Sequence, residues 1–193
     1  IVDEQAVYDP RDHNDRLLLG LKGTMSEAEL YWMRLRLDGG KLNKARRGQY
    51  SFLAAPGYVW DDVKLCFRLD PDEQVQRAVR LVFEEFRARR SAYGVCHALG
   101  RQGVQLPLRE VGSRKVVWAT PGHSAITYML HNPVYAGAYV YGRTEQRRAL
   151  VDGKVRRHHK RKLEQKDWKV FLRDRHPGYI SWEEFMDNQR QLE

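Results

Sequence analysis

The segment from residue 24 to residue 48 constrains the fold most, because it predicts one long helix whose two halves differ in chemistry. Thr24 can serve as its N-cap, and Glu27 stands three residues later, as a capping box requires. Large apolar residues recur through the first half at heptad-like spacings of four and three: Leu21, Met25, Ala28, Trp32 and Leu35. The short segment before this seam cannot cover it. We therefore expect a partner subunit, or another domain, to pack against the seam.

The second half of this helix is small and basic. Beyond Leu37 the apolar face does not continue, and Gly39 and Gly40 lower the stability of the helix. Cations replace the apolar residues, at Lys41, Lys44, Arg46 and Arg47. A helix end without an apolar face need not be buried in protein. It can lie along DNA, and the net charge of +9 also favours a phosphate polymer as partner.

Composition excludes several classes of protein. No apolar run approaches the roughly 18 residues that cross a bilayer, and no signal peptide opens the chain. Cys66 and Cys96 lie far apart without CxxC spacing, which argues against a disulfide framework or a zinc finger. These features favour a protein of the reducing cytoplasm. The chain opens on Ile1 without a methionine, and its apolar start is typical of the end of an upstream element, so we expect a fragment.

Three further helices follow in the middle of the chain. Asp70, Pro71 and Glu73 predict the start of the first, with one buried face formed by Val75, Ala78, Val79, Val82, Phe83 and Phe86. The second begins at Ser91 and is stopped by Gly100 and Gly103. Thr120 and Pro121 predict the cap and first residue of the third, which turns Ile126, Met129 and Leu130 inward.

Short hairpins alternate with these helices. Residues 58–60 and 64–69 predict one hairpin, and residues 106–118 a basic loop or two-stranded wing. Residues 136–141 alternate like a strand, and Ser181 can cap a last helix. The predicted fold is α+β and mostly α: a long N-terminal helix, then a helix-turn-helix-like domain of three helices with short hairpins.

A basic tract extends from residue 143 to residue 173. It holds 12 of the 34 lysines and arginines against four acids, and residues 156–162 are its densest part. Such a tract is usually a solvated face or a flexible loop, but it can also follow a phosphate backbone. His158 and His159 stand among these cations, which disfavours a metal site. The sequence has no nucleotide-binding glycine loop, no HExxH and no nucleophile motif, so we expect no catalytic or metal-binding residues in this chain.

Several motifs in this order resemble one family, the large serine recombinases (serine integrases and transposases). Its long linking helix resembles residues 17–29, 34–36 and 40–48. Its recombinase domain resembles Asp70-Pro-Asp-Glu-Gln, Val82-Phe83 and Asn132-Pro-Val-Tyr-Ala-Gly-Ala-Tyr-Val-Tyr-Gly142. The lead-in to its zinc ribbon resembles His176-Pro-Gly-Tyr-Ile-Ser-Trp-Glu-Glu184.

The resemblance implies a parent protein that cuts DNA by serine attack, leaving 5′-phosphoserine links, and that exchanges strands within a tetramer. It implies four parts: residues 1–23 as a remnant of the catalytic domain, 24–48 as the linking helix, 49–142 as the DNA-binding recombinase domain, and 143–193 as a basic segment and the start of the zinc-ribbon region. The catalytic serine is not in this chain, and the zinc ribbon would lie beyond its C-terminus, so no cofactor is expected here. The implied partners are a double-stranded attachment site and further copies of the parent, in a bacterial or phage-encoded, cytoplasmic setting.

Sixteen residues are candidates for DNA contact. Arg34 and Arg36 match arginines of the family's linking helix and are expected at phosphates, and the four cations that follow are expected along the backbone in the minor groove. Three residues early on the third helix face away from its core side and are candidates for base edges: His123, Ser124 and Thr127. The remaining candidates for phosphate contact lie on the wing and in the basic tract: Arg109, Arg114, Lys115, Arg156, Arg157, Arg161 and Lys162.

Two other functions fit parts of the pattern. A winged-helix transcriptional regulator, with residues 21–35 as its dimer helix, would bind a specific site without any upstream domain. A nuclease or RNA-processing enzyme would need a catalytic site that the sequence does not reveal, and metal-dependent cleavage by this chain alone would indicate it.

Overall fold

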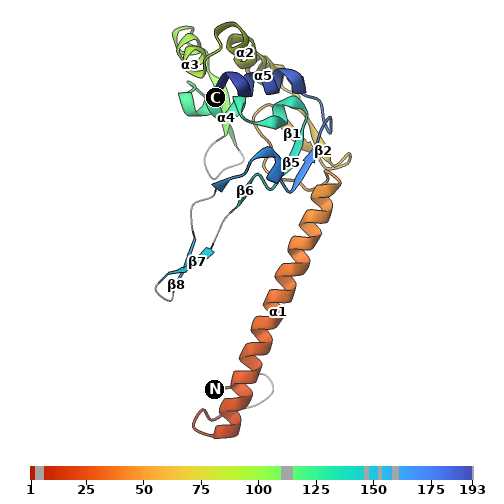
Figure 1. Ribbon diagram of the computed structural model, residues 1–193, viewed down its shortest axis with the longest axis vertical. Coiled ribbons are helices and arrows are strands. Elements are labelled where there is room, and N and C mark those ends of the chain that lie inside the picture. Colours follow the sequence, from red (N-terminus) through yellow and green to blue (C-terminus); the bar gives the residue numbers. More distant parts are fainter. Residues whose placement is uncertain (3–6, 110–114, 146–147, 152–153, 158–160, 193) are drawn as a thin grey trace. The chain divides into compact units, whose positions relative to one another are not determined.

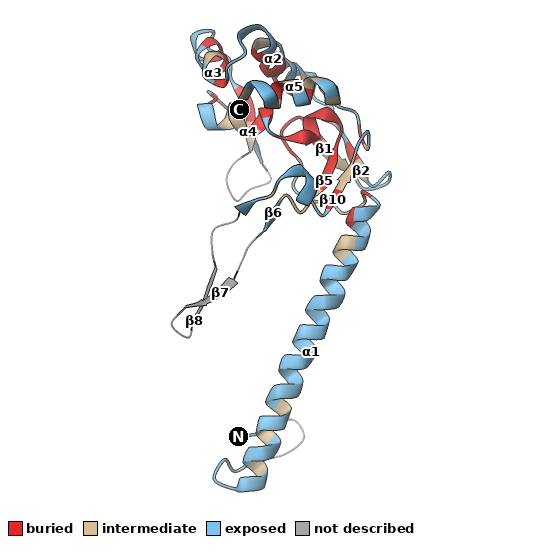
Figure 2. Ribbon diagram, viewed as in Figure 1, coloured by how far each residue is buried: buried red, intermediate tan, exposed pale blue. Residues whose placement is uncertain are grey.

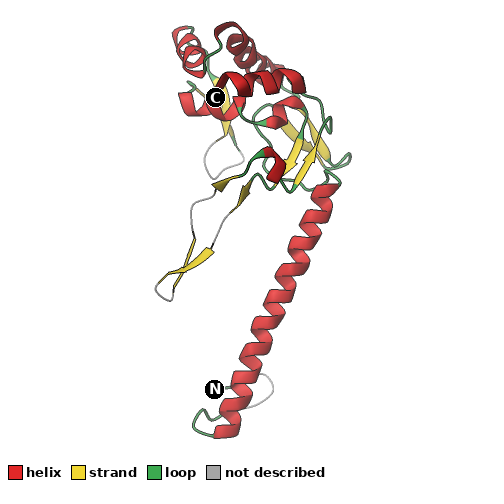
Figure 3. Cartoon of the chain, in the orientation of Figure 1, coloured by secondary structure: helices red, strands yellow, loops and turns green. Residues whose placement is uncertain are grey.

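The computed structural model describes residues 1–2, 7–109, 115–145, 148–151, 154–157 and 161–192. The chain divides into two compact units, Ile1–Lys44 and Ala45–Glu193 (Figure 1). Helices dominate, and the strands form short two-stranded pairs (Figure 3). The predicted α+β, mostly α, fold class is confirmed. Within the described residues, no helix combines the length and the apolarity needed to cross a membrane.

Helix α1 (His13–Arg46) begins earlier than predicted. Its N-terminal amides are capped by Asp12, whose Oδ1 accepts hydrogen bonds from the backbone N–H of Asn14 (2.8 Å) and Asp15 (3.1 Å). Thr24 lies inside the helix, where its hydroxyl donates to the Leu21 carbonyl at 2.8 Å. The predicted capping box at Thr24 is therefore wrong, because the chain is already helical when it reaches this threonine.

Almost all of α1 is exposed (Figure 2). Ala45 is the one residue of this helix that is buried. The large members of the predicted apolar seam are each about half exposed: Leu21, Met25, Trp32 and Leu35. The seam is therefore not part of a core formed by the residues that the structure describes.

The second unit opens with the hairpin β1 (Tyr58–Asp61) and β2 (Cys66–Leu69), paired antiparallel with Tyr58 opposite Leu69. Helix α2 (Glu73–Arg89) follows and buries the predicted apolar face. Its cap is Asp72, which accepts the Gln74 N–H at 2.8 Å, rather than Asp70 as predicted. Asp70 instead accepts the N–H of Asp72 at 3.0 Å, so it holds the turn before the helix.

Two residues separate α2 from helix α3 (Ala92–Arg101), and Ser91 caps α3 as predicted. The strands β3 (Leu106–Arg109) and β4 (Val116–Ala119) pair antiparallel and confirm the two-stranded wing. Helix α4 (His123–Leu130) comes next, with Ile126, Met129 and Leu130 buried as predicted. The three helices pack in sequence order, α3 contacting both α2 and α4.

The start of α4 differs from its prediction. Gly122 is the N-cap and supplies no side-chain hydrogen bond, so Thr120 does not cap the helix and Pro121 is not its first residue. The carbonyl oxygen of Pro121 accepts a hydrogen bond from the Cys96 thiol on α3 at 3.2 Å. This contact from another element ties Pro121 into the connection and leaves the helix to begin after Gly122.

The region after α4 forms the core around a short 3-10 helix, η1 (Pro133–Ala136), capped by Asn132. The predicted strand from residue 136 is shorter, because η1 and Gly137 at a φ of +73° precede β5 (Tyr139–Tyr141). Strand β5 pairs with β10 (Val170–Leu172) across the intervening basic tract. This pairing brings residues on both sides of the tract to one place.

Helix α5 (Trp182–Leu192) closes the second unit. Ser181 caps it as predicted, accepting the Glu184 N–H at 3.1 Å. Ion pairs join it to α2 and to the residue that follows α2, Glu184 with Arg87 and Asp187 with Arg90, both at 2.8 Å. The amide of Gln189 donates to the Leu130 carbonyl at 2.9 Å and so fixes α5 on the end of α4.

The basic tract contains ordered backbone pairing where the structure describes it. Strand β6 (Thr144–Glu145) pairs with β9 (Arg161–Lys162), and β7 (Arg148–Val151) with β8 (Lys154–Arg157), both antiparallel. A short 3-10 helix, η2 (Gln165–Asp167), then leads into β10. Where it is described, the tract therefore contains two short two-stranded ladders.

Candidate nucleic-acid interface

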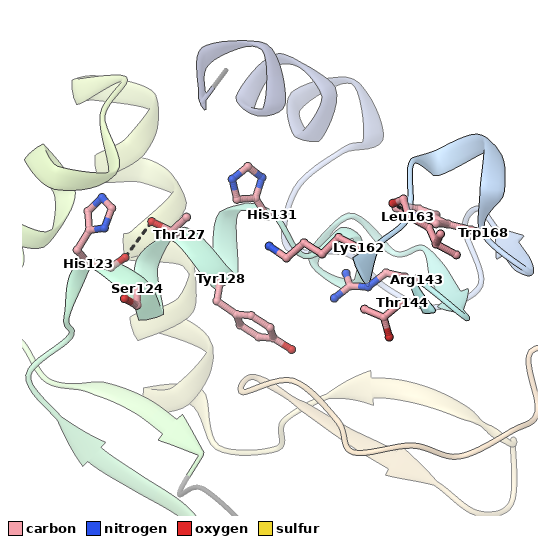
Figure 4. Close-up of a pocket in the computed structure, with 10 residues that line it drawn as sticks. All are labelled: His123, Ser124, Thr127, Tyr128, His131, Arg143, Thr144, Lys162, Leu163 and Trp168. Carbon is pink, nitrogen blue, oxygen red and sulfur yellow. Dashed lines mark hydrogen bonds between the residues drawn. The ribbon is translucent and has the colours of Figure 1, made fainter. Parts of the chain in front are cut away.

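A groove of about 590 Å³ lies between α4 and the β6–β9 ladder, within the second unit (Figure 4). One wall is the outer face of α4, and the other comes from residues on and beside the ladder. The lining residues are His123, Ser124, Thr127, Tyr128, His131, Arg143, Thr144, Lys162, Leu163 and Trp168. Four of these, His123, Ser124, Thr127 and Lys162, were predicted from the sequence as DNA contacts.

The α4 wall follows from the periodicity of that helix. Ile126, Met129 and Leu130 face the core, so residues 123, 124, 127, 128 and 131 lie on the opposite side and reach the groove. The Thr127 hydroxyl donates to the His123 carbonyl at 2.9 Å, a bond drawn in Figure 4. The hydroxyl oxygen of Thr127 can therefore accept a further hydrogen bond, while its proton is already used.

The opposite wall is cationic and aromatic. In Figure 4 the side chains of Lys162 and Arg143 both extend toward α4. Trp168 is held in place by its indole N–H, which donates to the Leu163 carbonyl at 3.1 Å. Among the described residues that line the groove none is acidic. The groove therefore favours an anionic ligand, with hydroxyl and imidazole groups facing it from α4.

Arg143 is a groove residue that sequence reasoning missed. It follows directly on the quoted run that ends at Gly142, but its place in the groove depends on the pairing of β6 with β9, which no local pattern reveals. Its Nη1 donates to the Asn132 side-chain oxygen at 3.1 Å. Burial lowers the pKa of the Arg143 guanidinium, because water is partly removed from the charge.

The predicted residues of the long helix are exposed cations. Arg34, Arg36 and Lys44 lie on the surface of α1, and so do Arg46 and, just after the helix, Arg47. Lys41 is half-buried and pairs with Asp38 at 3.5 Å. The structure therefore leaves these side chains accessible to a polyanion, as the prediction requires.

The remaining predicted residues lie outside the groove lining. Lys115 precedes β4 and is exposed, and Arg161 is exposed on β9 beside Lys162. Arg114 lies outside the residues that the structure describes. Arg109 lies in strand β3, and Arg156 and Arg157 lie in strand β8. The side chains of these three arginines are outside the part of the chain that the structure describes. In the described ranges no group of three His, Cys, Asp or Glu side chains could hold a metal ion.

The family follows from a comparison with known proteins. A family model described as Recombinase matches residues 73–193, from the first turn of α2 to the end of α5. The chain belongs to the Recombinase family. The matched region includes the residues of both walls of the groove.

One curated relative and two solved structures are also similar to this chain. Uncharacterized protein y4bA/y4pH of Sinorhizobium fredii is 46% identical over 197 residues, which span all of this chain and 28% of the relative. A crystal structure of an LSR-DNA complex matches with a TM-score of 0.51 and 16% identity, over 81% of this chain and 37% of the other. A structure concerning the attP site of a Listeria innocua prophage matches with a TM-score of 0.52 and 19% identity, over 81% of this chain and 51% of the other. The family model confirms the recombinase domain expected from the sequence, and the two solved structures share its fold.

Proposed function

We propose that this chain is the DNA-binding part of a site-specific recombinase of the large serine type, and that it grips a double-stranded attachment site through the groove beside α4. The observation that carries this proposal is that two kinds of side chain line the same groove. Hydroxyl and imidazole groups that can address base edges line one wall, and cations that can address phosphates line the other. One similar solved structure is an LSR-DNA complex and the other concerns a prophage attP site, which supports DNA as the ligand.

In this proposal α4 enters the major groove, which is wide enough for a helix and displays a distinct donor and acceptor pattern for each base pair. The exposed cations of α1 and of the basic tract contact phosphates of the DNA backbone. Phosphate contacts supply affinity without sequence information. The cations would therefore supply affinity, and the residues of α4 would supply specificity.

The chain spans about 28% of its curated relative, so the activity of the whole protein is part of the proposal. Strand cleavage and rejoining through a phosphoserine link would be carried out by a catalytic domain outside these residues, and zinc would be bound by a ribbon beyond residue 193. Self-association of the parent as dimer and tetramer would use the exposed seam of α1. Membership of the Recombinase family argues against a winged-helix transcriptional regulator.

Selection from a pool of randomised duplexes tests the DNA-binding function. The chain is expected to enrich one sequence and to bind it more tightly than a scrambled duplex of equal length. Binding should weaken steeply with salt, because each neutralised phosphate contributes about −0.9 to the slope of log K against log salt. Failure to enrich any sequence, or a flat salt dependence, would contradict the proposal.

A further inference from the structure

Arg143 is a charge that none of the described residues neutralises. Its guanidinium is half-buried in the wall of the groove. Among the described residues, its hydrogen-bond partner is the neutral side chain of Asn132, and no carboxylate lies within ion-pair distance. Water is partly excluded from this guanidinium, as the lowered pKa of Arg143 reflects. A desolvated cation without an anion costs free energy, so the site is set for an anion that arrives from outside.

Asn132 holds the guanidinium in position. It is buried, with 4% of its surface exposed, and its side-chain oxygen lies 3.1 Å from Arg143 Nη1 and 3.4 Å from the N–H of Val134. The second contact caps η1, so the asparagine is fixed by the backbone of the core. One N–H of Arg143 is occupied by this contact. The other donors of the planar group remain for a ligand, in a geometry that suits the two oxygens of a phosphate.

The surroundings select a phosphate on a polymer rather than a free carboxylate. Lys162 reaches into the same groove from β9, and both side chains extend toward α4 (Figure 4). The same groove is lined on its other side by hydroxyl groups of α4, which can address the base edges of a nucleic acid. We infer that Arg143 anchors a DNA backbone phosphate beside α4, with Lys162 as the second cation and Asn132 as the positioning residue.

This inference rests on the proposed function and refines it. A phosphate fixed at Arg143 sets the register of α4 along the major groove, since phosphate contacts orient a protein on the duplex before any base is read. The exposed basic residues predicted from the sequence would then add affinity, and the half-buried arginine would supply the fixed reference point.

Charge removal at Arg143 tests the inference against a matched control. Arg143→Gln removes the charge and keeps a group that can bond to Asn132. Arg77→Gln removes the same charge from the exposed surface of α2, where Arg77 pairs with Glu73 at 2.9 Å. Anisotropy titrations of the full chain with a random-sequence 30-base-pair duplex, over a series of salt concentrations, give affinity and salt slope.

Arg143→Gln is expected to bind the duplex about tenfold more weakly or worse, as expected for a lost charge-assisted hydrogen bond. Its salt slope should become shallower by about 0.9, the contribution of one phosphate. Arg143→Lys should keep the slope and recover part of the affinity, because lysine keeps the charge and loses the fork of donors. Arg77→Gln should match the wild type in both measurements.

Thermal unfolding separates an anchor from a structural residue. Arg143→Gln is expected to melt no lower than the wild type, because it removes a desolvated charge. If Arg143→Gln lowers both the melting temperature and the affinity for the duplex, the inference is overturned. It is also overturned if Arg143→Gln binds the duplex as tightly as Arg77→Gln does. If the wild-type chain binds no duplex, the proposed function fails as well. If the wild-type chain binds the duplex and the Arg143 variants bind it with unchanged affinity and salt slope, only the inference about Arg143 fails.

Discussion

At the scale of single residues, the two hydroxyl groups of the groove are not equivalent. The Thr127 hydroxyl gives its proton to the His123 carbonyl, so it can only accept from a ligand. The described residues offer the Ser124 hydroxyl no hydrogen-bond partner, and it is exposed in the groove. Ser124 can therefore donate or accept, whereas Thr127 selects for a donor such as the amino group of adenine or cytosine.

Replacing Ser124 and Thr127 with Ala is expected to narrow the affinity ratio between the selected and the scrambled duplex. The loss should be roughly 1–3 kcal/mol for each good base contact, while affinity for scrambled DNA changes little. Competition binding measures both. Thr127→Ser keeps the acceptor oxygen and should keep most of the ratio.

A variant with Ala at four basic positions provides the contrast, because these cations are expected at phosphates: Arg156, Arg157, Arg161 and Lys162. This variant should weaken binding to all duplexes alike. A full specificity ratio in the Ser124 and Thr127 variant would mean that the wing at residues 109–115 reads the bases, and α4 would not be the recognition helix.

His176 is expected to make the stability of the fold depend on pH. Its ring packs edge-on against Tyr58 and Phe67, and its Nε2 lies 2.9 Å from the Val134 carbonyl oxygen. Burial lowers the pKa of His176, and the neighbouring charge of Arg175 lowers it further. The unfolded chain therefore binds a proton that the folded chain does not, between the folded pKa and the ordinary value near 6.5. This contribution to stability is complete above that ordinary value and is lost as the pH falls below it.

Lowering the pH from 7.5 to 5.5 should thus destabilise the wild type more than His176→Gln. The difference should grow by no more than about 1.4 kcal/mol per pH unit. Urea denaturation at a series of pH values measures it, with His97→Gln, a change at an exposed histidine of α3, as the control. Parallel stability curves for the wild type and His176→Gln would contradict the assignment.

At the scale of elements, the sequence predicted helix faces better than helix ends. The apolar periodicity of α2 identified all six buried residues, because a face repeats over several turns and does not depend on any single one. The predicted N-caps of α1, α2 and α4 were wrong, because several residues near the start of each helix could act as its N-cap. Asp70 and Asp72 both fit the pattern, and the local turn decided between them.

The groove shows where sequence reasoning stops. The α4 wall was predictable, since its residues lie opposite a buried face. The other wall depends on β6 pairing with β9 and on β5 pairing with β10. These ladders bring together residues that are far apart in the sequence, such as Thr144 with Lys162 and Tyr139 with Leu172. Long-range pairing leaves no periodic signal, so Arg143 and Trp168 could not be assigned to a site from the sequence.

The corrected caps make a prediction of their own. Asp72→Ala is expected to lower the free energy of unfolding by about 1 kcal/mol, because it leaves the Gln74 N–H without its partner. Thr120→Ala should stay within about 0.5 kcal/mol of the wild type, since Thr120 is exposed and is not the cap of α4. Urea denaturation of both variants checks this. A cost at Thr120 equal to that at Asp72 would restore the cap predicted from the sequence.

At the scale of the whole molecule, the two units differ in how they are stabilised. The second unit has a core of its own, whereas α1 buries one residue and carries Gly20, Gly23, Gly39 and Gly40 with open space around each. A long helix without a packed face is marginal in water, and four glycines weaken it further. We therefore expect α1 to gain its stability from partners: protein along the apolar seam of its first half, and DNA along the cations of its second.

The seam is the part of α1 that can be tested as a protein contact. Met25→Glu with Trp32→Glu places two carboxylates on the helix side where a second copy would pack, at residues that are 58% and 59% exposed in the single chain. Desolvating these charges against an apolar partner is costly, so the variant should lose self-association on DNA. The same change should leave the fold of the second unit intact, because neither side chain belongs to its core. Sedimentation of the wild type and the variant on a duplex with two sites measures assembly, and Glu27→Gln with Glu29→Gln serves as a control for altered charge elsewhere on the same turns. Assembly of the variant as complete as that of the wild type would show that the seam does not join subunits.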